Sequence, residues 1–144
     1  MKNSVQRFAI AVLVLTMAAA GVMIVQAQQQ SSVKGDFRNA QTAEVRDASG
    51  TVLLRGTFAP ADGDDPQEIE RLATLQPTAE GGKMAGEAEV EYQKDAPDTQ
   101  EIEFQVLSAQ PGAVLTLTLD GKEVLKATAA KDGKAEAEAL VAVK

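Results

Sequence analysis

An acidic run near the middle of the chain is the first candidate for chemistry. Three aspartates surround a glycine in Asp62-Gly63-Asp64-Asp65, and Glu68 follows shortly after. Hard oxygen ligands from a glycine-containing loop are what Ca²⁺ binds in proteins. The spacing does not fit an EF-hand, and a solvated acidic turn is the competing interpretation. The candidate metal ligands are Asp62, Asp64, Asp65 and Glu68.

Two further rows of carboxylates follow, Glu87/Glu89/Glu91 and Glu101/Glu103. Paired carboxylates with different pKa values are the catalytic groups of glycoside hydrolysis. In this chain, however, the glutamates alternate with apolar residues, which predicts that they lie on the outward side of strands. There we expect no neighbour to raise one pKa and create a general acid. The rows therefore predict a solvated sheet face rather than a catalytic pair.

The residue types that are missing narrow the chemistry further. The chain contains no cysteine and no histidine. Thiol chemistry, thiolate metal sites, the usual zinc sites and the commonest general base are therefore excluded. No serine lies in a G-x-S-x-G motif, and no glycine-rich loop suits a phosphate. We expect no enzymatic activity, no catalytic residues and no bound cofactor other than a weakly held Ca²⁺.

The elements that must position these carboxylates are predicted to be β-strands. Apolar residues alternate with polar ones in several short runs, as in Ile102, Phe104 and Val106, which is the pattern of a strand with one buried face. Asp120-Gly121 between two such runs is a strong hairpin signal, and Asp132-Gly133 repeats it. The expected strands are near 37–47, 51–59, 67–75, 84–93, 100–107, 113–120, 122–130 and 134–143.

One of these segments, residues 66–75, also has features of a helix. Asp65-Pro66-Gln67-Glu68 combines an N-cap residue, a proline at the first helical position and a capping-box glutamate. Against this, Gln67-Glu68-Ile69-Glu70 recurs 33 residues later as Gln100-Glu101-Ile102-Glu103, where the alternation indicates a strand. We therefore expect a strand here as well.

Together these patterns predict an all-β domain over residues 36–144. Short antiparallel strands joined by tight turns are typical of a β-sandwich or barrel, and we expect a small antiparallel β-sandwich of about eight hairpin-connected strands. The chain has four phenylalanines, one tyrosine and no tryptophan, so its core must be aliphatic. Without cysteines it has no disulfides, and packing alone must stabilise it.

The N-terminus has the form of an export signal. Lys2 and Arg7 precede an uncharged, mostly apolar run over residues 8–25, and Val25-Gln26-Ala27 suits a signal peptidase. We expect a signal helix and cleavage after residue 27, then a flexible tether over residues 28–35, which makes the domain secreted or periplasmic. The alternative is that residues 8–25 are retained as a membrane anchor.

The charge of the chain limits its partners. The net charge is −7, and removal of residues 1–27 would take away two of the 14 basic residues. Such a surface repels nucleic acid and anionic membranes, so we expect contact with a membrane only through a retained signal segment. The sequence predicts an exported, non-enzymatic module with an interaction or structural role and a protein partner. The alternative function is weak Ca²⁺ binding through the loop from Asp62 to Glu68.

Overall fold

A computed structural model describes residues 33–61 and 65–143. All regular structure in these residues is β-strand, which confirms the all-β expectation. The described part of the chain contains no helix with the length and apolarity that a membrane span requires. The expected signal segment, and residues 28–32 of the expected tether, lie outside the described residues.

The described residues form nine strands where about eight were expected. The difference is β3, a three-residue strand that the alternation did not reveal, and the first strand is shorter than expected because residues 37–41 precede it. The strands are β1 (Thr42–Arg46), β2 (Val52–Thr57), β3 (Ala59–Ala61), β4 (Glu68–Pro77), β5 (Ala85–Gln93), β6 (Thr99–Leu107), β7 (Val114–Leu119), β8 (Lys122–Thr128) and β9 (Ala135–Ala142).

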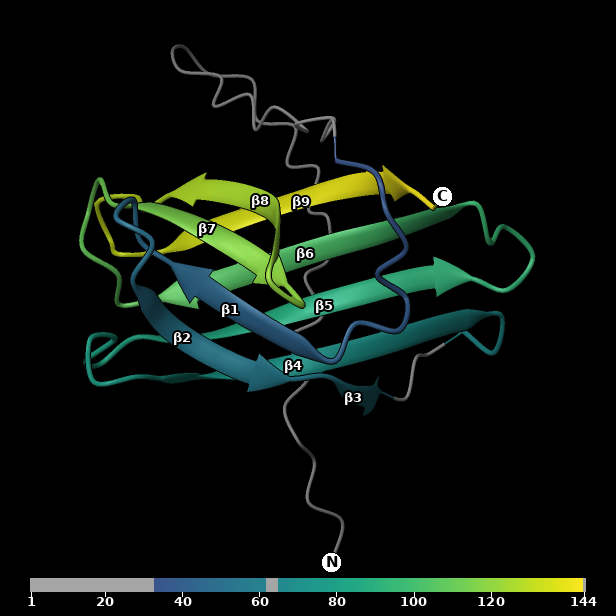
Figure 1. Ribbon diagram of the computed structural model, residues 1–144, viewed down its shortest axis with the longest axis horizontal. Helices are drawn as coiled ribbons and strands as arrows, with labels where there is room; N and C mark the ends of the chain where they lie inside the picture. The colour runs from purple at the N-terminus through teal and green to yellow at the C-terminus, as the bar shows by residue number, and fades with distance from the viewer. Residues whose placement is uncertain (1–32, 62–64, 144) are drawn as a thin grey trace, which may run out of the picture.

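All strand pairs are antiparallel, and together they make a nearly closed, barrel-like sheet. The hydrogen-bonded order is β8-β7-β1-β2-β4-β5-β6-β9, with β3 paired to β4. Strands β8, β7, β1 and β2 form one layer, and β9, β6, β5 and β4 form the layer behind it (Figure 1). The layers are joined by the short pairing of β2 with β4 at Leu54–Pro77 and Arg55–Gln76. On the other side, β8 and β9 are the two ends of the order.

The hairpin between β7 and β8 has the turn that its sequence predicted. Asp120 and Gly121 both have positive φ, 47° and 82°, as a two-residue type I′ turn requires. The Asp120 carboxylate also accepts hydrogen bonds from the backbone N–H groups of Gln41 (3.0 Å) and Thr42 (2.8 Å). This turn residue therefore also fixes the start of β1.

The segment that resembled a helix is a strand, β4, as expected. It pairs with β5 over eight residues, from Glu68–Gln93 to Leu75–Gly86. Asp65 starts no helix; its carboxylate accepts a hydrogen bond from the N–H of Gln67 at 2.8 Å within the preceding turn. Long-range pairing supplies hydrogen bonds along the whole strand, and this outweighs the local capping signal.

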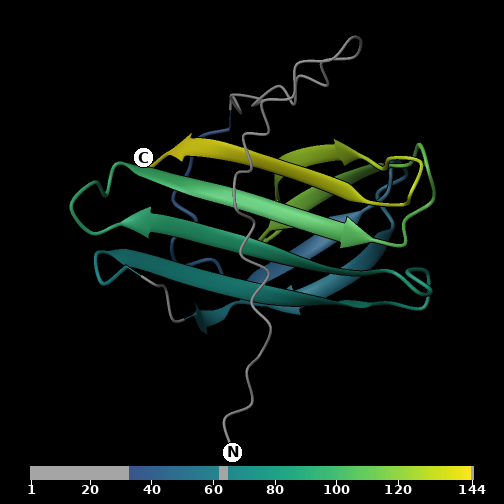
Figure 2. The same cartoon turned by 180° about the vertical axis from the view of Figure 1, so that it is seen from behind.

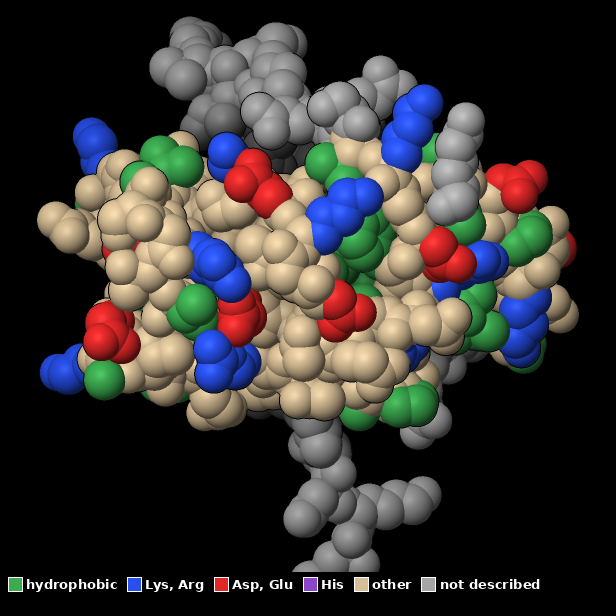
Figure 3. Space-filling view, viewed as in Figure 1, with side chains coloured by type: hydrophobic (Ala, Val, Ile, Leu, Met, Phe, Trp, Pro, Cys, Tyr) green, Lys and Arg blue, Asp and Glu red, His purple; other side chains and the backbone are tan. Residues whose placement is uncertain are grey.

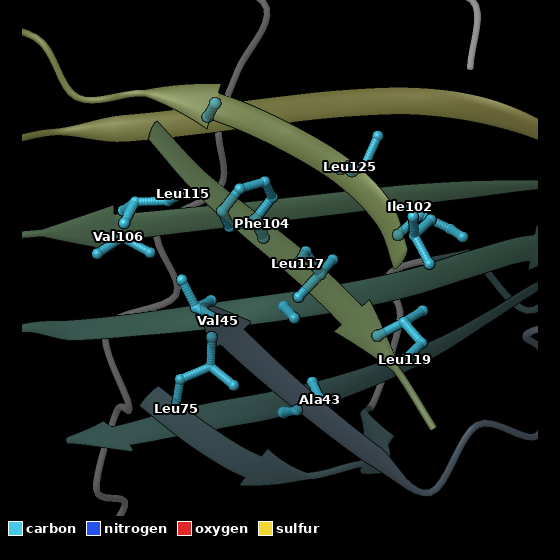
Figure 4. Packing of buried hydrophobic residues seen from close by; sticks show 14 of the residues in the cluster. Ala43, Val45, Leu75, Ile102, Phe104, Val106, Leu115, Leu117, Leu119 and Leu125 are labelled. Atoms are coloured by element: carbon cyan, nitrogen blue, oxygen red, sulfur yellow. The ribbon is translucent and has the colours of Figure 1, made fainter. Parts of the chain in front are cut away.

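The core lies between the two layers and is aliphatic, with Phe104 at its centre (Figure 4). Strand β7 contributes three fully buried leucines to it, while β6 contributes alternate residues from Gln100 to Val106. Each large apolar side chain removed from water stabilises the fold by about 1.5–3 kcal/mol. The labelled side chains are Ala43, Val45, Leu75, Ile102, Phe104, Val106, Leu115, Leu117, Leu119 and Leu125.

Residues 33–41, here called the N-terminal strap, cross one end of the barrel before β1 begins (Figure 1). The strap buries Phe37 and is held mainly by side chains of the strands. The buried amide of Gln100 accepts from the N–H of Phe37 at 2.9 Å and donates to the carbonyl of Gly35. Arg71 donates to the carbonyls of Arg38 (3.0 Å) and Ala40 (2.7 Å).

Candidate functional site: an acidic sheet face

The outward side of the layer β4-β5-β6-β9 gathers most of the glutamates of the domain. Figure 2 shows this layer from its outer side. Because successive side chains of a strand point to opposite faces, every second residue of these strands lies on it. We call this surface the acidic face; its glutamates are Glu68, Glu70, Glu87, Glu89, Glu91, Glu101, Glu103, Glu136 and Glu138.

The register of the strands places these carboxylates directly opposite one another. Glu89 of β5 pairs with Glu103 of β6, and Glu103 pairs on its other side with Glu138 of β9. A second row runs in the same way from Glu70 through Glu91 to Glu101. Directly opposed Cβ atoms are about 4.5–5.5 Å apart, and like charges at such positions are destabilising.

The closest group of carboxylates belongs to β6 and β9. Glu101, Glu103 and Glu138 each offer one oxygen, and these three oxygens lie within 4.8 Å of one another. Glu101 and Glu103 are half-buried, and Glu138 is exposed. Three oxygen ligands at this spacing are compatible with a hard cation such as Ca²⁺, or with a shared proton.

The glutamates at the centre of the face hold their protons more tightly than isolated carboxyls do. Burial, followed by the charges of Glu70 and Glu103, raises the pKa of Glu89 to about 8. Burial and the charge of Glu138 raise the pKa of Glu103 to about 7. Both causes disfavour the ionised form, because water is partly excluded and the charged groups that act on these two carboxyls are acids.

The second row behaves in the same way. Burial raises the pKa of Glu91 to about 7, with a further contribution from the charges of Glu68 and Glu101. Burial and the neighbouring Glu138 carboxyl also raise the pKa of Glu101. Our expectation that nothing on this face would raise a pKa was therefore wrong. It treated each strand separately, whereas the neighbours that matter belong to adjacent strands.

Few positive charges reach the acidic face. Among the described residues, the one ion pair on this face joins Lys134 Nζ to Glu136 Oε2 at 2.6 Å, at the β9 margin. Two glutamine amides also contact it: Gln93 donates to Glu68 at 2.9 Å and Gln105 donates to Glu136 at 3.4 Å. The central carboxylates thus face one another across the strands without a lysine or arginine partner in the described structure.

The opposite layer carries charges of both signs. On its outer side Glu44 binds Arg46 at 2.6 Å and Arg55 at 2.9 Å, and Lys126 lies 2.8 Å from Glu123. Acidic and basic side chains are interspersed on this side of the molecule (Figure 3). The hydrogen bond from Arg46 lowers the pKa of Glu44, the reverse of what happens on the acidic face.

The expected Ca²⁺ loop is only partly described. Asp62 and Asp64 lie outside the described residues. Asp65 is exposed and is used in the turn before β4, where its carbonyl accepts from the N–H of Glu68 at 3.0 Å. Glu68 belongs to the acidic face, where it accepts from Gln93. The described residues of the proposed loop therefore have separate roles in the turn and on the sheet.

Sequence reasoning missed part of the acidic face. Glu136 and Glu138 were recognised as strand residues but not as neighbours of Glu101 and Glu103. The available signal was the Ala-Glu-Ala-Glu alternation after the Asp132-Gly133 turn, which indicated an outward row of acids. Its alignment with the rows of β5 and β6 depends on strand order.

The chain matches no known protein-family model, no curated protein and no solved structure. The functional argument therefore depends on the acidic face itself. Chemically, this surface can attract cations, hold protons and present a partner with a half-buried, negatively charged plane.

Proposed function

We propose that this protein is an exported, non-enzymatic module of the β-sandwich type that binds a cationic segment of a partner protein on its acidic face. The observation that carries the proposal is the direct opposition of Glu89, Glu103 and Glu138 across strands β5, β6 and β9, where the described part of the chain supplies these three carboxylates with no lysine or arginine in an ion pair. Such pairs destabilise the free domain, and lysine or arginine side chains of a partner would remove the repulsion. Export through residues 1–27, with a secreted or periplasmic location, belongs to the same proposal; the alternative is anchoring by residues 8–25.

A binding role explains the central glutamates better than catalysis does. Glycoside hydrolysis needs one carboxyl that is protonated and a second that is ionised at the same pH. Glu89 and Glu103 have pKa values of about 8 and about 7, so both resist ionisation near neutral pH. A partner that supplies positive charge would ionise them together, which suits recognition of several cationic groups.

The proposal is tested with a peptide of alternating lysine and valine, added to the purified protein in calorimetric titrations. A triple variant, Glu89→Gln/Glu103→Gln/Glu138→Gln, removes three carboxyl groups from the centre of the face. The matched control, Glu80→Gln/Asp95→Asn/Glu123→Gln, removes three carboxyl groups from exposed residues outside the face. We expect the first triple to weaken binding at least tenfold and the control less than threefold. Equal losses would show general charge attraction and overturn the proposed site.

A divalent cation is the second candidate ligand of this protein, favoured by the closely spaced oxygens of Glu101, Glu103 and Glu138. A ligand that binds the folded state raises its melting temperature. Thermal unfolding in millimolar Ca²⁺ and in chelator is the measurement. A rise that Glu138→Gln abolishes would place the ion on the acidic face, whereas a rise that Asp65→Asn abolishes would place it in the loop from Asp62 to Glu68.

A further inference from the structure

We propose that the cationic segment of the partner binds as an extended strand along the free edge of β9, antiparallel to it, and so adds a strand to the layer of β4, β5, β6 and β9. This mode of binding rests on the proposed function, since it describes how the same partner lies on the domain. Strand addition of this kind takes its affinity from main-chain hydrogen bonds and its specificity from alternate side chains.

Strand β9 directs main-chain groups away from the sheet. It pairs with β6, and the structure describes no strand hydrogen-bonded to its other side (Figure 2). The N–H of Val143 donates to the carbonyl of Asp98, next to β6, at 2.9 Å, so the odd-numbered residues of β9 bond toward β6. Because the main-chain groups of successive residues point to opposite edges of a strand, those of Glu138 and Leu140 point to the free edge.

Contacts at both ends mark out this free edge. At one end the turn from β8 covers it, where the N–H of Ala130 donates to the carbonyl of Lys134 at 2.8 Å. At the other end the strap reaches it, where the N–H of Gly35 donates to the carbonyl of Ala142 at 3.3 Å. Both carbonyls belong to even-numbered residues, in agreement with the pairing toward β6. Between them there is room for an added strand of about five residues, a common strand length.

The other edges of the described sheet carry features that hinder pairing. Strand β3 has three residues, and its central residue, Pro60, has no N–H to donate. Strand β8 has a register shift in its pairing with β7, and Lys122 at its start donates to the carbonyl of Lys34 at 2.6 Å. Strand β9 has eight residues, no proline and an unbroken register with β6. Since short strands, prolines and bulges protect sheet edges, β9 is the edge suited to a partner.

The side chains along β9 indicate the chemistry of the added strand. Leu140 is 62% exposed, more than any other large apolar residue that the structure describes. A lysine opposite Glu138 would meet an opposite charge, and a lysine opposite Leu140 would cover it with methylenes and reach Glu101, the ladder partner of Leu140. The partner residues between these lysines point inward beside the buried Ala139 and Val141, where valine is suitable. A second copy of β9 would instead bring its own glutamates to this edge and be repelled.

Methylation of the peptide backbone tests the main-chain contacts. The alternating lysine–valine peptide is compared, in calorimetric titrations of the purified protein, with one form N-methylated at the lysine main-chain nitrogens and another at the valine nitrogens. In the antiparallel arrangement the N–H groups of the outward lysines point to β9 and those of the valines point away. Both forms have the same charge, so general attraction to the acidic face affects them equally. We expect methylated lysine nitrogens to weaken binding at least about tenfold and methylated valine nitrogens less than about threefold.

The outcomes separate this mode of binding from the proposed function. Equal losses for the two forms, or a greater loss from methylated valine nitrogens, would overturn strand addition on β9 while binding of a cationic partner remains. If the unmethylated peptide does not bind, the proposed function fails, and strand addition fails with it.

A substitution on β9 tests the same edge from the side of the protein. Leu140→Pro removes an N–H that is not bonded to β6, so the strand should tolerate it, whereas Leu140→Ala keeps the N–H and removes the side chain. We expect Leu140→Pro to weaken peptide binding at least about tenfold and Leu140→Ala less than about fivefold. Thermal unfolding shows whether both variants fold, and the methylated peptides decide the question if Leu140→Pro does not. Equal affinities of the two folded variants would overturn the proposal.

Discussion

The two layers of this domain both bury apolar side chains between them, but the charges on their outer surfaces are arranged in opposite ways. On the outer side of β1 and β2, Glu44 lies between Arg46 and Arg55 and its pKa is lowered. On the outer side of β5 and β6, Glu89 lies opposite Glu103 and the pKa values of both are raised. A carboxylate on a sheet surface is therefore stabilising or destabilising according to its cross-strand neighbour, and not according to exposure alone.

The two outer surfaces differ in whether their carboxylates have cationic partners within the domain. On the layer of β1 and β2, Glu44 already forms ion pairs with two arginines. On the acidic face, opposed glutamates still repel one another in the folded domain. Uncharged residues at these positions would make the domain more stable. Sites that violate the local rules of stability are often functional, which is why we propose a binding role for this face.

The largest expected effect comes from the core that the two layers share. Phe104 is almost fully buried at its centre, and Phe104→Ala should lower the free energy of unfolding by about 3–5 kcal/mol. Unfolding followed by circular dichroism should remain a single transition, because both layers lose the same packing. Two separate transitions would show that the layers are independent, and the comparison of their faces within one cooperative unit would fail.

The next largest effect is the response of stability to pH. Glu89, Glu91, Glu101 and Glu103 have raised pKa values in the folded state, so the folded domain binds more protons than the unfolded chain between about pH 4.3 and pH 8. Their contribution to stability is complete below this window and is lost as the pH rises through it. After allowance for solvent screening, we expect a loss of about 1–2 kcal/mol from pH 5 to pH 8.5 in urea unfolding.

Glu89→Gln is the matched variant for this measurement. It should flatten the decline above pH 6, whereas Glu80→Gln, outside the face, should leave the decline as it is. A wild-type domain that becomes more stable between pH 5 and pH 8.5 would contradict the raised pKa values.

The smallest effect is expected for Glu44, on the outer side of β1 and β2, where stability changes with pH in the opposite direction. The pKa of Glu44 is lowered, chiefly by the hydrogen bond from Arg46, so its stabilisation is present above the unfolded pKa and is lost as the pH falls through the folded one. Glu44→Gln should cost about 0.5–1 kcal/mol at pH 7 and almost nothing at pH 2. Urea unfolding at both pH values is the measurement; an equal cost at both would indicate lost packing rather than a lost ion pair.

Much of the fold could be predicted from the sequence because alternation and turn residues act locally. Ile102, Phe104 and Val106 were correctly placed on the buried side of a strand, and Asp120-Gly121 was correctly assigned to a hairpin. Strand β3 was missed because its three residues, Ala59–Ala61, include a proline and show no alternation. The first strand was expected to begin near residue 37, but β1 begins at Thr42. Phe37 and Ala40 lie in the strap, where they are buried although they belong to no strand.

The candidate site could be predicted only in part. The outward direction of Glu89 and Glu103 follows from alternation within a strand. Their raised pKa values follow from strand order and register, which place β5 beside β6 and β6 beside β9. Residues 138 and 103 are far apart in the chain, and no local pattern shows that they face each other. The sequence analysis predicted solvated rows of glutamates because it treated each strand by itself, without the strands that lie beside it in the sheet.

The N-terminal strap also affects how the domain bears mechanical load. Its backbone is held by Gln100 of β6, Arg71 of β4 and Asp120 of the β7–β8 turn. A pull on the chain ahead of the strap would therefore reach both layers through these three contacts. None of them uses a glutamate of the acidic face.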